Sequence, residues 1–262
     1  MEHMGYLSTL RQADPATEAS QTQIIVYTLP EPLDTLTPAS RILIEEAPNL
    51  LAAGSNVGLR TWEASLHLAQ YLHTFPDLVR GKNVIELGAG TGLVSMLCAG
   101  ALQADFVLST DGLPHVVESM DKNIQRNCQS AIARHVRPER LTTRVLDWAD
   151  TEHLEDILTY NEQLLDFDLI VGADITYSPD VVPTLAEMLK VLMVENFSEK
   201  KMQALVSATV RNKTTLDVFR RACESRSLEI ENVDFECPSV TEQKGFFHEQ
   251  AFPIVIMRIW AA

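Results

Sequence analysis

The sequence lacks several features that would place it in particular classes of protein. It has no apolar run near the roughly 18 residues of a membrane-spanning helix and no basic, apolar leader, so we expect no membrane contact and no targeting signal. Its four cysteines form no C-x-x-C pair, and its histidines show no metal-ligand spacing. We therefore expect reduced thiols in a cytoplasmic protein, without a metal site.

Positive charge is also scarce, with 21 Lys and Arg against 36 Asp and Glu and a net charge of -15. A phosphate backbone would be repelled by such a chain, so direct binding of nucleic acid is not expected. The charge suits a partner with a basic surface, and it is equally compatible with solubility alone.

The chain divides into a short extension and one larger domain. Its 262 residues are 46% hydrophobic, enough for one sizeable core. Residues 1–23 are polar, and two possible strands follow at 24–29 and 41–46, separated by prolines. We expect an N-terminal extension over residues 1–53 and a main domain over 54–262.

Strand and helix patterns alternate through the main domain. The expected strands are residues 84–87, 106–110, 142–146, 169–173, 204–210, 229–235 and 251–260. The expected helices are residues 61–74, 93–102, 114–127, 180–194 and 214–225, and residues 148–161 are expected to form a loop and a helix. This order predicts an α/β fold with a mostly parallel, Rossmann-like sheet, helices on both faces and an antiparallel last strand. Ligands of such sheets bind beyond the carboxyl ends of the strands.

The first of these strands ends in a glycine-rich turn. Residues 83–92 read NVIELGAGTG, with Glu86 before glycines at 88, 90 and 92. Glycine allows tight turning and close approach of a ligand. The dinucleotide fingerprint needs glycine at position 93, where leucine stands. An acidic strand end followed by G-x-G-x-G is instead typical of S-adenosylmethionine pockets, although a generic tight turn gives the same pattern.

The next two strand ends carry groups suited to a nucleoside. Asp111 can accept hydrogen bonds from both ribose hydroxyls, or it can cap the helix that follows. Asp147 and Trp148 can flank an adenine, with a hydrogen bond to its amino group and stacking on its ring. The alternative is that Trp148 belongs to the core and Asp147 caps a helix.

The fourth strand ends where a small residue, an acid and an aromatic residue meet. Ala173 leaves room for a cofactor, Asp174 lies where a substrate nitrogen would arrive, and Tyr177 can hold an ammonium group by cation–π attraction. A simple Asp- and Pro-containing turn would also explain this composition. Trp62, outside the alternating region, either closes over the cofactor or packs in the core.

Together these pieces resemble the seven-β-strand S-adenosylmethionine-dependent methyltransferases, and more narrowly methyltransferase family 16, which modifies lysines in proteins. The matching segments are RTWEA at 60–64, ELGAGTG at 86–92, Asp111, LDW at 146–148 and the D-x-x-Y motif DITY at 174–177. By this resemblance, cofactor contacts are expected at Trp62, Gly88, Ala89, Gly90, Asp111, Trp148 and Ala173. The pattern of residues at the strand ends adds three further expected cofactor contacts, Glu86, Gly92 and Asp147. The resemblance assigns the D-x-x-Y acid and aromatic to Asp174 and Tyr177, our candidate catalytic residues.

Two further segments resemble the fungal enzymes that methylate a lysine of eukaryotic elongation factor 2. They are GLRTWEA at 58–64 and SATVRN at 207–212. The resemblance implies a monomer that converts S-adenosyl-L-methionine to S-adenosyl-L-homocysteine and has this translation factor as its protein partner. Residues 24–60 are our candidate for part of the recognition surface.

Other functions remain open on the same fold. They are methylation of another protein, a small molecule or RNA, and a non-catalytic binding module. A dinucleotide-dependent dehydrogenase shares the glycine turn and the acid on the second strand, but Leu93 and the expected final hairpin argue against it.

Overall fold

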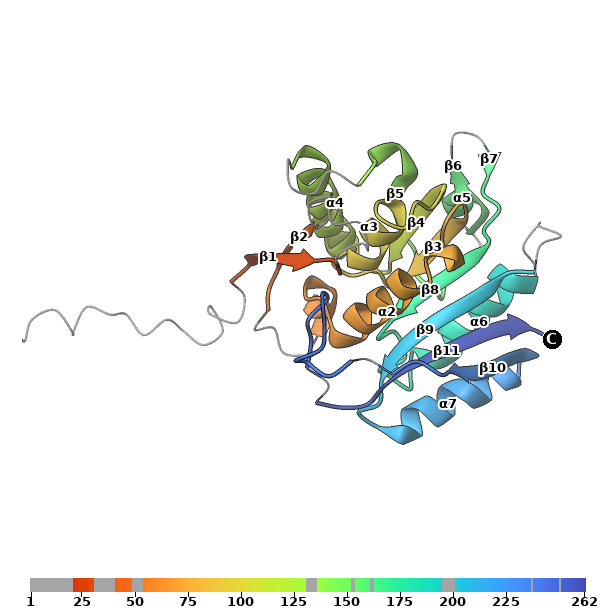
Figure 1. Ribbon diagram of the computed structural model, residues 1–262. Coiled ribbons are helices and arrows are strands. Elements are labelled where there is room, and N and C mark those ends of the chain that lie inside the picture. The colour runs from red at the N-terminus through yellow and green to blue at the C-terminus, as the bar shows by residue number, and fades with distance from the viewer. Residues whose placement is uncertain are drawn as a thin grey trace, which may run out of the picture.

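The computed structural model describes residues 21–30, 41–48, 54–130, 136–151, 154–160, 163–194, 201–236, 238–249 and 251–262. Its centre is a seven-stranded sheet in the order β10-β11-β9-β8-β3-β4-β5 (Figure 1). The strands of this sheet are β3 (Asn83–Leu87), β4 (Phe106–Asp111), β5 (Leu141–Val145), β8 (Leu169–Ala173), β9 (Gln203–Thr209), β10 (Leu228–Val233) and β11 (Ile254–Ala261).

Five neighbouring strands pair in parallel, and β11 runs antiparallel to both of its neighbours, β9 and β10, so β10 runs in the same direction as those five. The predicted α/β sheet with an antiparallel last strand is therefore confirmed. The strands after β3 continue in one direction through β4 and β5, whereas β8 and β9 lie on its other side. This change of direction next to β3 is where open α/β sheets leave a crevice for a ligand.

Helices cover both faces of the sheet because β3 and its neighbours are apolar on both sides. Val84, Ile85 and Leu87 are fully buried, as is typical of a central parallel strand. The helices are α2 (Glu63–Thr74), α3 (Leu93–Ala99), α4 (Pro114–Gln129), α5 (Leu154–Leu158), α6 (Val182–Val194) and α7 (Lys213–Glu224). One hydrophobic cluster joins α2, α3 and α4 to the sheet, and a second joins α5, α6 and α7 to the opposite face.

All the predicted strands and helices are present, and most end points shift by a few residues. In the segment 148–161 the described helix is only α5 (Leu154–Leu158), and Thr159–Tyr160 form a strand instead. The sequence did not predict the 3-10 helices η2 (Gly54–Leu59), η3 (Pro76–Leu78) and η4 (Pro138–Arg140), or the hairpin of β6 (Thr159–Tyr160) and β7 (Gln163–Leu164). Such short elements depend on tertiary contacts more than on a hydrophobic period. In the described part of the chain, no helix is long and apolar enough to cross a membrane.

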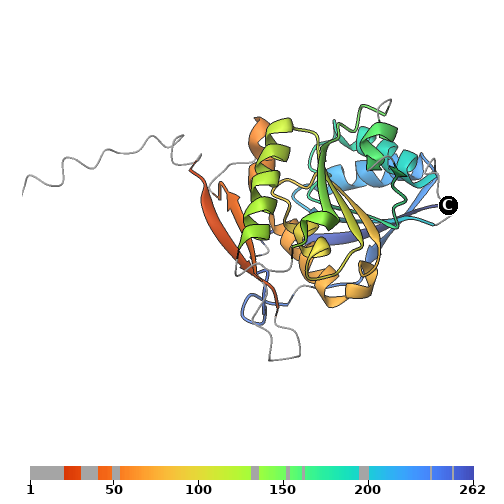
Figure 2. The same ribbon diagram turned by 90° about the horizontal axis from the view of Figure 1, so that it is seen from above.

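The N-terminal strands β1 (Gln23–Thr28) and β2 (Arg41–Glu46) form a separate antiparallel hairpin. Figure 2 shows this hairpin lying beside α4. Residues 1–20 lie outside the described residues, and so does the segment 49–53 that would contain the predicted boundary. The division at residue 53 stays a prediction.

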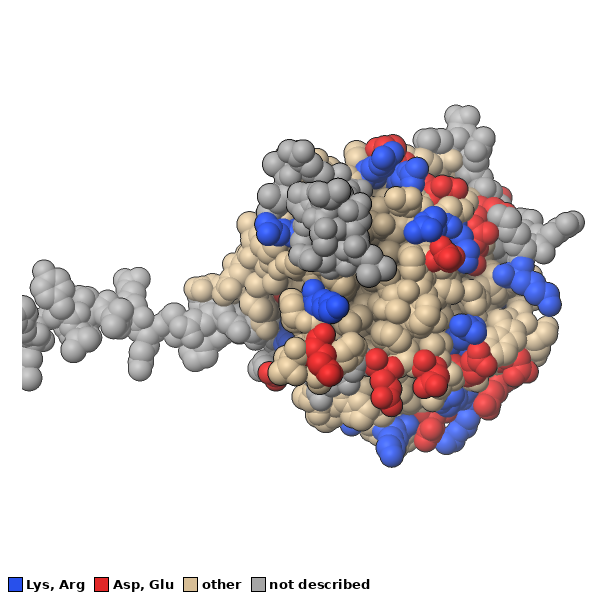
Figure 3. Space-filling model, in the orientation of Figure 1, with Lys and Arg blue, Asp and Glu red and all other residues tan. Residues whose placement is uncertain are grey.

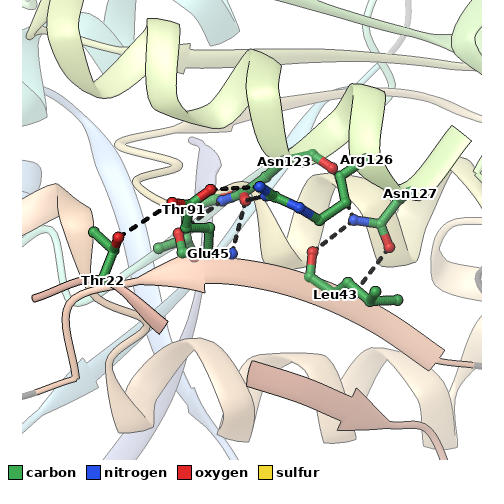
Figure 4. Close-up of polar contacts among 7 residues, drawn as sticks. All are labelled: Thr22, Leu43, Glu45, Thr91, Asn123, Arg126 and Asn127. Atoms are coloured by element: carbon green, nitrogen blue, oxygen red, sulfur yellow. Dashed lines mark hydrogen bonds and ion pairs between the residues drawn. The ribbon is translucent and has the colours of Figure 1, made fainter. Parts of the chain in front are cut away.

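Two side-chain amides of α4 attach the hairpin to the main domain (Figure 4). Asn127 accepts from the Leu43 N–H at 2.9 Å and donates to the Leu43 carbonyl at 2.7 Å. One turn earlier, Asn123 accepts from the Glu45 N–H at 2.8 Å and donates to its carbonyl at 3.2 Å. The Arg126 guanidinium also pairs with Glu45 and lowers the pKa of that carboxyl. The amides thus satisfy the backbone groups of β2 as a neighbouring strand would.

Candidate active site

A cavity of about 370 Å³ opens at the carboxyl ends of the central strands. It is lined by Val57, Gly58, Arg60, Trp62, Ser65, Gly88, Ala89, Gly90, Thr91, Asp111, Gly112, Leu113, Leu146, Asp147, Trp148, Ala173, Asp174, Ile175, Tyr177, Val181 and Arg211. Ten of the twelve predicted site residues are in this set, and the fold brings them together from five separate segments. Glu86 and Gly92 are the two that do not line it.

The glycine loop forms one wall because only glycine fits its backbone. Gly88 has a φ of 63°, and a Cβ on it would lie 2.6 Å from the Ile175 side chain. Gly90 has a φ of 55°, and its Cβ would lie 3.1 Å from the Gly58 carbonyl oxygen. Left-handed backbone and close packing together exclude other residues at Gly88.

Asp111 fixes the shape of this loop. Its Oδ2 accepts the Gly90 N–H and its Oδ1 accepts the Leu113 N–H, both at 3.1 Å. Burial raises the pKa of the Asp111 carboxyl, while these backbone hydrogen bonds lower it. The residue at the N-cap of α4 is Leu113, not Asp111. The carboxylate keeps acceptor positions free beyond these two bonds, since each oxygen has two lone pairs.

Glu86 lies beneath the loop and is 2% exposed. It accepts a hydrogen bond from the Ser95 hydroxyl of α3. Burial raises the pKa of Glu86 to about 8. Gly92, with a φ of 83°, is the N-cap of α3. Both residues hold the turn from behind, so direct cofactor contact by either one stays a prediction.

The adenine side of the predicted site carries a polar atom without a partner. The Trp148 ring lies against Gly88, where a Cβ would be 3.4 Å from the ring, and its buried indole N–H has no hydrogen-bond partner among the described residues. Asp147 accepts the Ala149 N–H at 3.0 Å. The Trp148 ring also packs against the core, so Trp148 belongs both to the cavity wall and to the core. The glycine cradle, the Asp111 carboxylate and the free indole N–H fit a nucleoside-containing cofactor.

The opposite wall centres on Asp174, whose backbone has a φ of 56°. Non-glycine residues in this region are strained, and such strain gathers at functional sites. Its Oδ1 accepts the Thr209 N–H at 3.1 Å, and its Oδ2 pairs with Arg211 Nη2 at 3.0 Å. The Asp174 side chain is only 9% exposed. Tyr177, at 56% exposed, stands at the mouth of the cavity.

Two guanidinium groups lie close to the Trp62 ring at the rim. The Cζ of Arg60 is 4.5 Å and that of Arg211 is 5.3 Å from its ring centroid. Its indole N–H donates to the Val57 carbonyl at 3.0 Å, which ties the start of α2 to η2. Trp62 lines the cavity, and its closure over a cofactor stays a prediction.

Sequence analysis did not assign Arg211, Arg60 or the η2 residues Val57 and Gly58 to the cavity, although all of them line it. Arg211 comes just after Val210, beyond the end of β9, and β9 pairs with β8, so its position near a strand end was a usable signal. Contact with Asp174 across 37 positions of chain was not predictable from spacing. Among the described residues, no group of three or more His, Cys, Asp or Glu could hold a metal ion.

Comparison with known proteins agrees with this geometry. A family model described as lysine methyltransferase matches residues 49–224. A solved structure from Streptococcus mutans, assigned as a SAM-dependent methyltransferase, superposes with a TM-score of 0.55 at 17% identity, covering 85% of this chain and 53% of that one. At this identity the superposition supports the fold alone.

Three curated relatives carry protein names that include a lysine methyltransferase activity. Protein-lysine N-methyltransferase EFM3 of Chaetomium thermophilum is 34% identical, covering 83% of this chain and 62% of its own. The human protein-lysine N-methyltransferase EEF2KMT is 25% identical over 83% of this chain and 63% of its own. An Arabidopsis thaliana calmodulin-lysine N-methyltransferase is 30% identical over 70% of this chain and 57% of its own. The chain spans about three fifths of the length of these relatives.

Proposed function

Because the chain belongs to the lysine methyltransferase family, we propose that it transfers a methyl group from S-adenosylmethionine to the side-chain amine of a lysine in a protein. This proposal rests on one observation, which is that a single cavity has two walls of different chemistry. A glycine loop, Asp111 and Trp148 form one wall, and Asp174 and Tyr177 form the other.

The first wall would hold the cofactor. Asp111 would accept hydrogen bonds from the ribose hydroxyls, and Trp148 would stack on the adenine beside Asp147. Gly88, Ala89 and Gly90 allow close approach, and Trp62 covers the opening. When bound, the sulfonium supplies a methyl group open to in-line displacement by an amine.

The second wall would position the acceptor. A lysine with its usual pKa of about 10.4 arrives as an ammonium ion, so it must be bound and then lose a proton from Nζ before it can attack. Asp174 orients the ammonium, and Tyr177 lines its channel through cation–π attraction. Removal of the side chain from water lowers its pKa and favours the neutral amine. Positioning of that amine and exclusion of water then contribute most to the rate.

For the acceptor protein we propose eukaryotic elongation factor 2. The segments at 58–64 and 207–212 support this choice through their resemblance to the fungal enzymes, and the second segment contains Arg211 of the cavity. The net charge of -15 suits a basic partner surface. In Figure 3 acidic side chains gather along the lower part of the visible face. We further propose that the protein acts in the cytoplasm as a monomer.

The test is mass spectrometry of elongation factor 2 after incubation with this protein and S-adenosylmethionine. One lysine should gain mass in multiples of a methyl group, and an Asp174→Asn variant should leave it unmodified. Calmodulin, which appears in the name of the Arabidopsis relative, is tested in parallel as a second acceptor. Methylation of calmodulin alone would replace the proposed substrate.

The remaining functions are separated by two further measurements. With labelled cofactor and a cell extract, the label should be released by protease and resist nuclease. Calorimetry with S-adenosylmethionine tests the cofactor wall directly. No binding at millimolar concentration would contradict the proposal and favour a non-catalytic module.

A further inference from the structure

Arg211 holds a position that the acceptor lysine would need. Its Nη2 lies 3.0 Å from Asp174 Oδ2, the oxygen of that carboxylate that is not bonded to the Thr209 N–H. Both oxygens of Asp174 therefore already have a donor, and one of the two donors is a cation. An arriving ammonium would meet a carboxylate whose charge is already compensated.

A second observation concerns the space behind Arg211. A small hollow of about 50 Å³ adjoins the main cavity and is lined by residues from the loop after β8, from the end of β9 and from the start of α7. Of the residues that the structure describes, Tyr177 and Arg211 are the two that line both spaces. The buried Thr209 hydroxyl, on the wall of the small hollow, has no hydrogen-bond partner among the described residues. Tyr177 and Arg211 therefore lie where the two hollows meet.

The Arg211 side chain is free to move in a way that the Asp174 side chain is not. Arg211 is 37% exposed, and its other contact is the face of Trp62, with Cζ 5.3 Å from the ring centroid. Exposed side chains change rotamer in picoseconds to nanoseconds. Asp174 is held by its own strained backbone and by the Thr209 N–H.

We propose that Arg211 is a gate on the acceptor site, whose guanidinium occupies Asp174 until the ammonium of the acceptor lysine replaces it. Movement of Arg211 also joins the two hollows and opens a path beside Tyr177. The inference rests on the proposed lysine methyl transfer for its purpose, but the competition between two cations for one carboxylate can be measured separately. Arg211 acts through Asp174 and is a positioning residue.

The gate lowers the apparent affinity for the acceptor in proportion to the fraction of molecules in which Arg211 has left Asp174. A partly exposed ion pair of this kind is worth little, so we expect its removal to strengthen binding by roughly two- to fivefold. The first probe is n-butylammonium, which carries the same charged end as lysine. Its dissociation constant, from NMR titration, should fall by this factor in Arg211→Gln and Arg211→Met. Arg211→Lys, which keeps a cation, should stay near the wild type.

The matched control is Lys213→Gln. Lys213 is exposed, lies two residues further along the chain and lines neither hollow, so this change removes the same charge without opening the gate. Equal tightening in Lys213→Gln and Arg211→Gln would mean that long-range charge causes the effect, and it would overturn the gate. Unchanged or weaker binding in both Arg211→Gln and Arg211→Met would overturn it as well.

Kinetics provide an independent readout. With elongation factor 2 as acceptor, Arg211→Gln should lower the acceptor KM by the same two- to fivefold and leave the cofactor KM unchanged. A wild type that methylates nothing would contradict the proposed function alone, because the n-butylammonium titration still decides whether the gate exists.

Discussion

The two walls of the cavity are held together in different ways. In the cofactor wall, supporting contacts come from nearby strand ends: Asp111 bonds to Gly90 and Leu113, and Glu86 supports the loop through Ser95. In the acceptor wall, Asp174 is fixed by residues 35 and 37 positions away, on the following strand and beyond it. The hydrogen bonds that support the glycine loop thus span at most 21 positions of the chain, although Trp62 and Trp148 join the same wall from more distant segments. The acceptor wall exists only after β8 and β9 have paired.

The largest effect should come from Asp174→Asn. Loss of the carboxylate charge should lower turnover by about 100-fold or more, in the range found for loss of one preorganised electrostatic contact. Cofactor affinity, measured by calorimetry, should be nearly unchanged because Asp174 belongs to the other wall. An equal loss of cofactor affinity would show that the walls are not separable.

Gly88→Ala should damage both walls at once, because its Cβ would overlap Ile175 from the strand end that carries Asp174. The control is Gly81→Ala, which has a similar φ of 67° but no atom within 4 Å of its Cβ. Left-handed backbone alone should cost Gly81→Ala about 1–2 kcal/mol of unfolding free energy. Gly88→Ala should lose more than this in urea denaturation and should also lose cofactor affinity. Equal destabilisation of the two variants would refute the packing argument.

Asp111→Asn should weaken the cofactor wall alone. Hydrogen bonds to a charged group contribute about 1.5–3 kcal/mol, so we expect cofactor affinity to fall by roughly tenfold or more in calorimetry. Turnover at saturating cofactor should stay close to that of the wild type. A fall in turnover under those conditions would place Asp111 in the chemistry of the acceptor.

The smallest effect concerns pH and the support beneath the cofactor wall. Burial raises the pKa of Glu86 to about 8, so the folded state binds a proton that the unfolded state releases above its ordinary pKa. The stability from this protonated carboxyl is full below the ordinary pKa and is lost as pH rises toward 8. Within that window the slope is up to about 1.4 kcal/mol per pH unit.

Denaturant titrations at several pH values between 5 and 8 test this expectation. Glu86→Gln keeps a neutral, hydrogen-bonding side chain and should remove this component of the pH dependence. The variant should therefore gain stability relative to the wild type as pH rises. A constant difference between the two proteins across this range would show that Glu86 is already ionised at pH 5.

The elements that the sequence predicted well share one property, which is that their signal is local. The buried run of β3, the glycines after it and the alternation of strands and helices all follow from residues close together in the chain. Asp111 and Trp148 could be assigned to the cavity because parallel strands end at the same edge of a sheet. Where the sequence left core and cavity open for Trp148, the structure shows contact with both.

The amino-acid sequence by itself determined the class of fold and the glycine turn of the cofactor wall, because periodicity and glycine spacing act over a few residues. The tertiary structure decided what those residues contact. It placed Glu86 under the loop, attached the hairpin to α4 through Asn123 and Asn127, and brought Arg211 onto Asp174. Contacts between distant segments depend on strand order and side-chain packing, which no local pattern encodes.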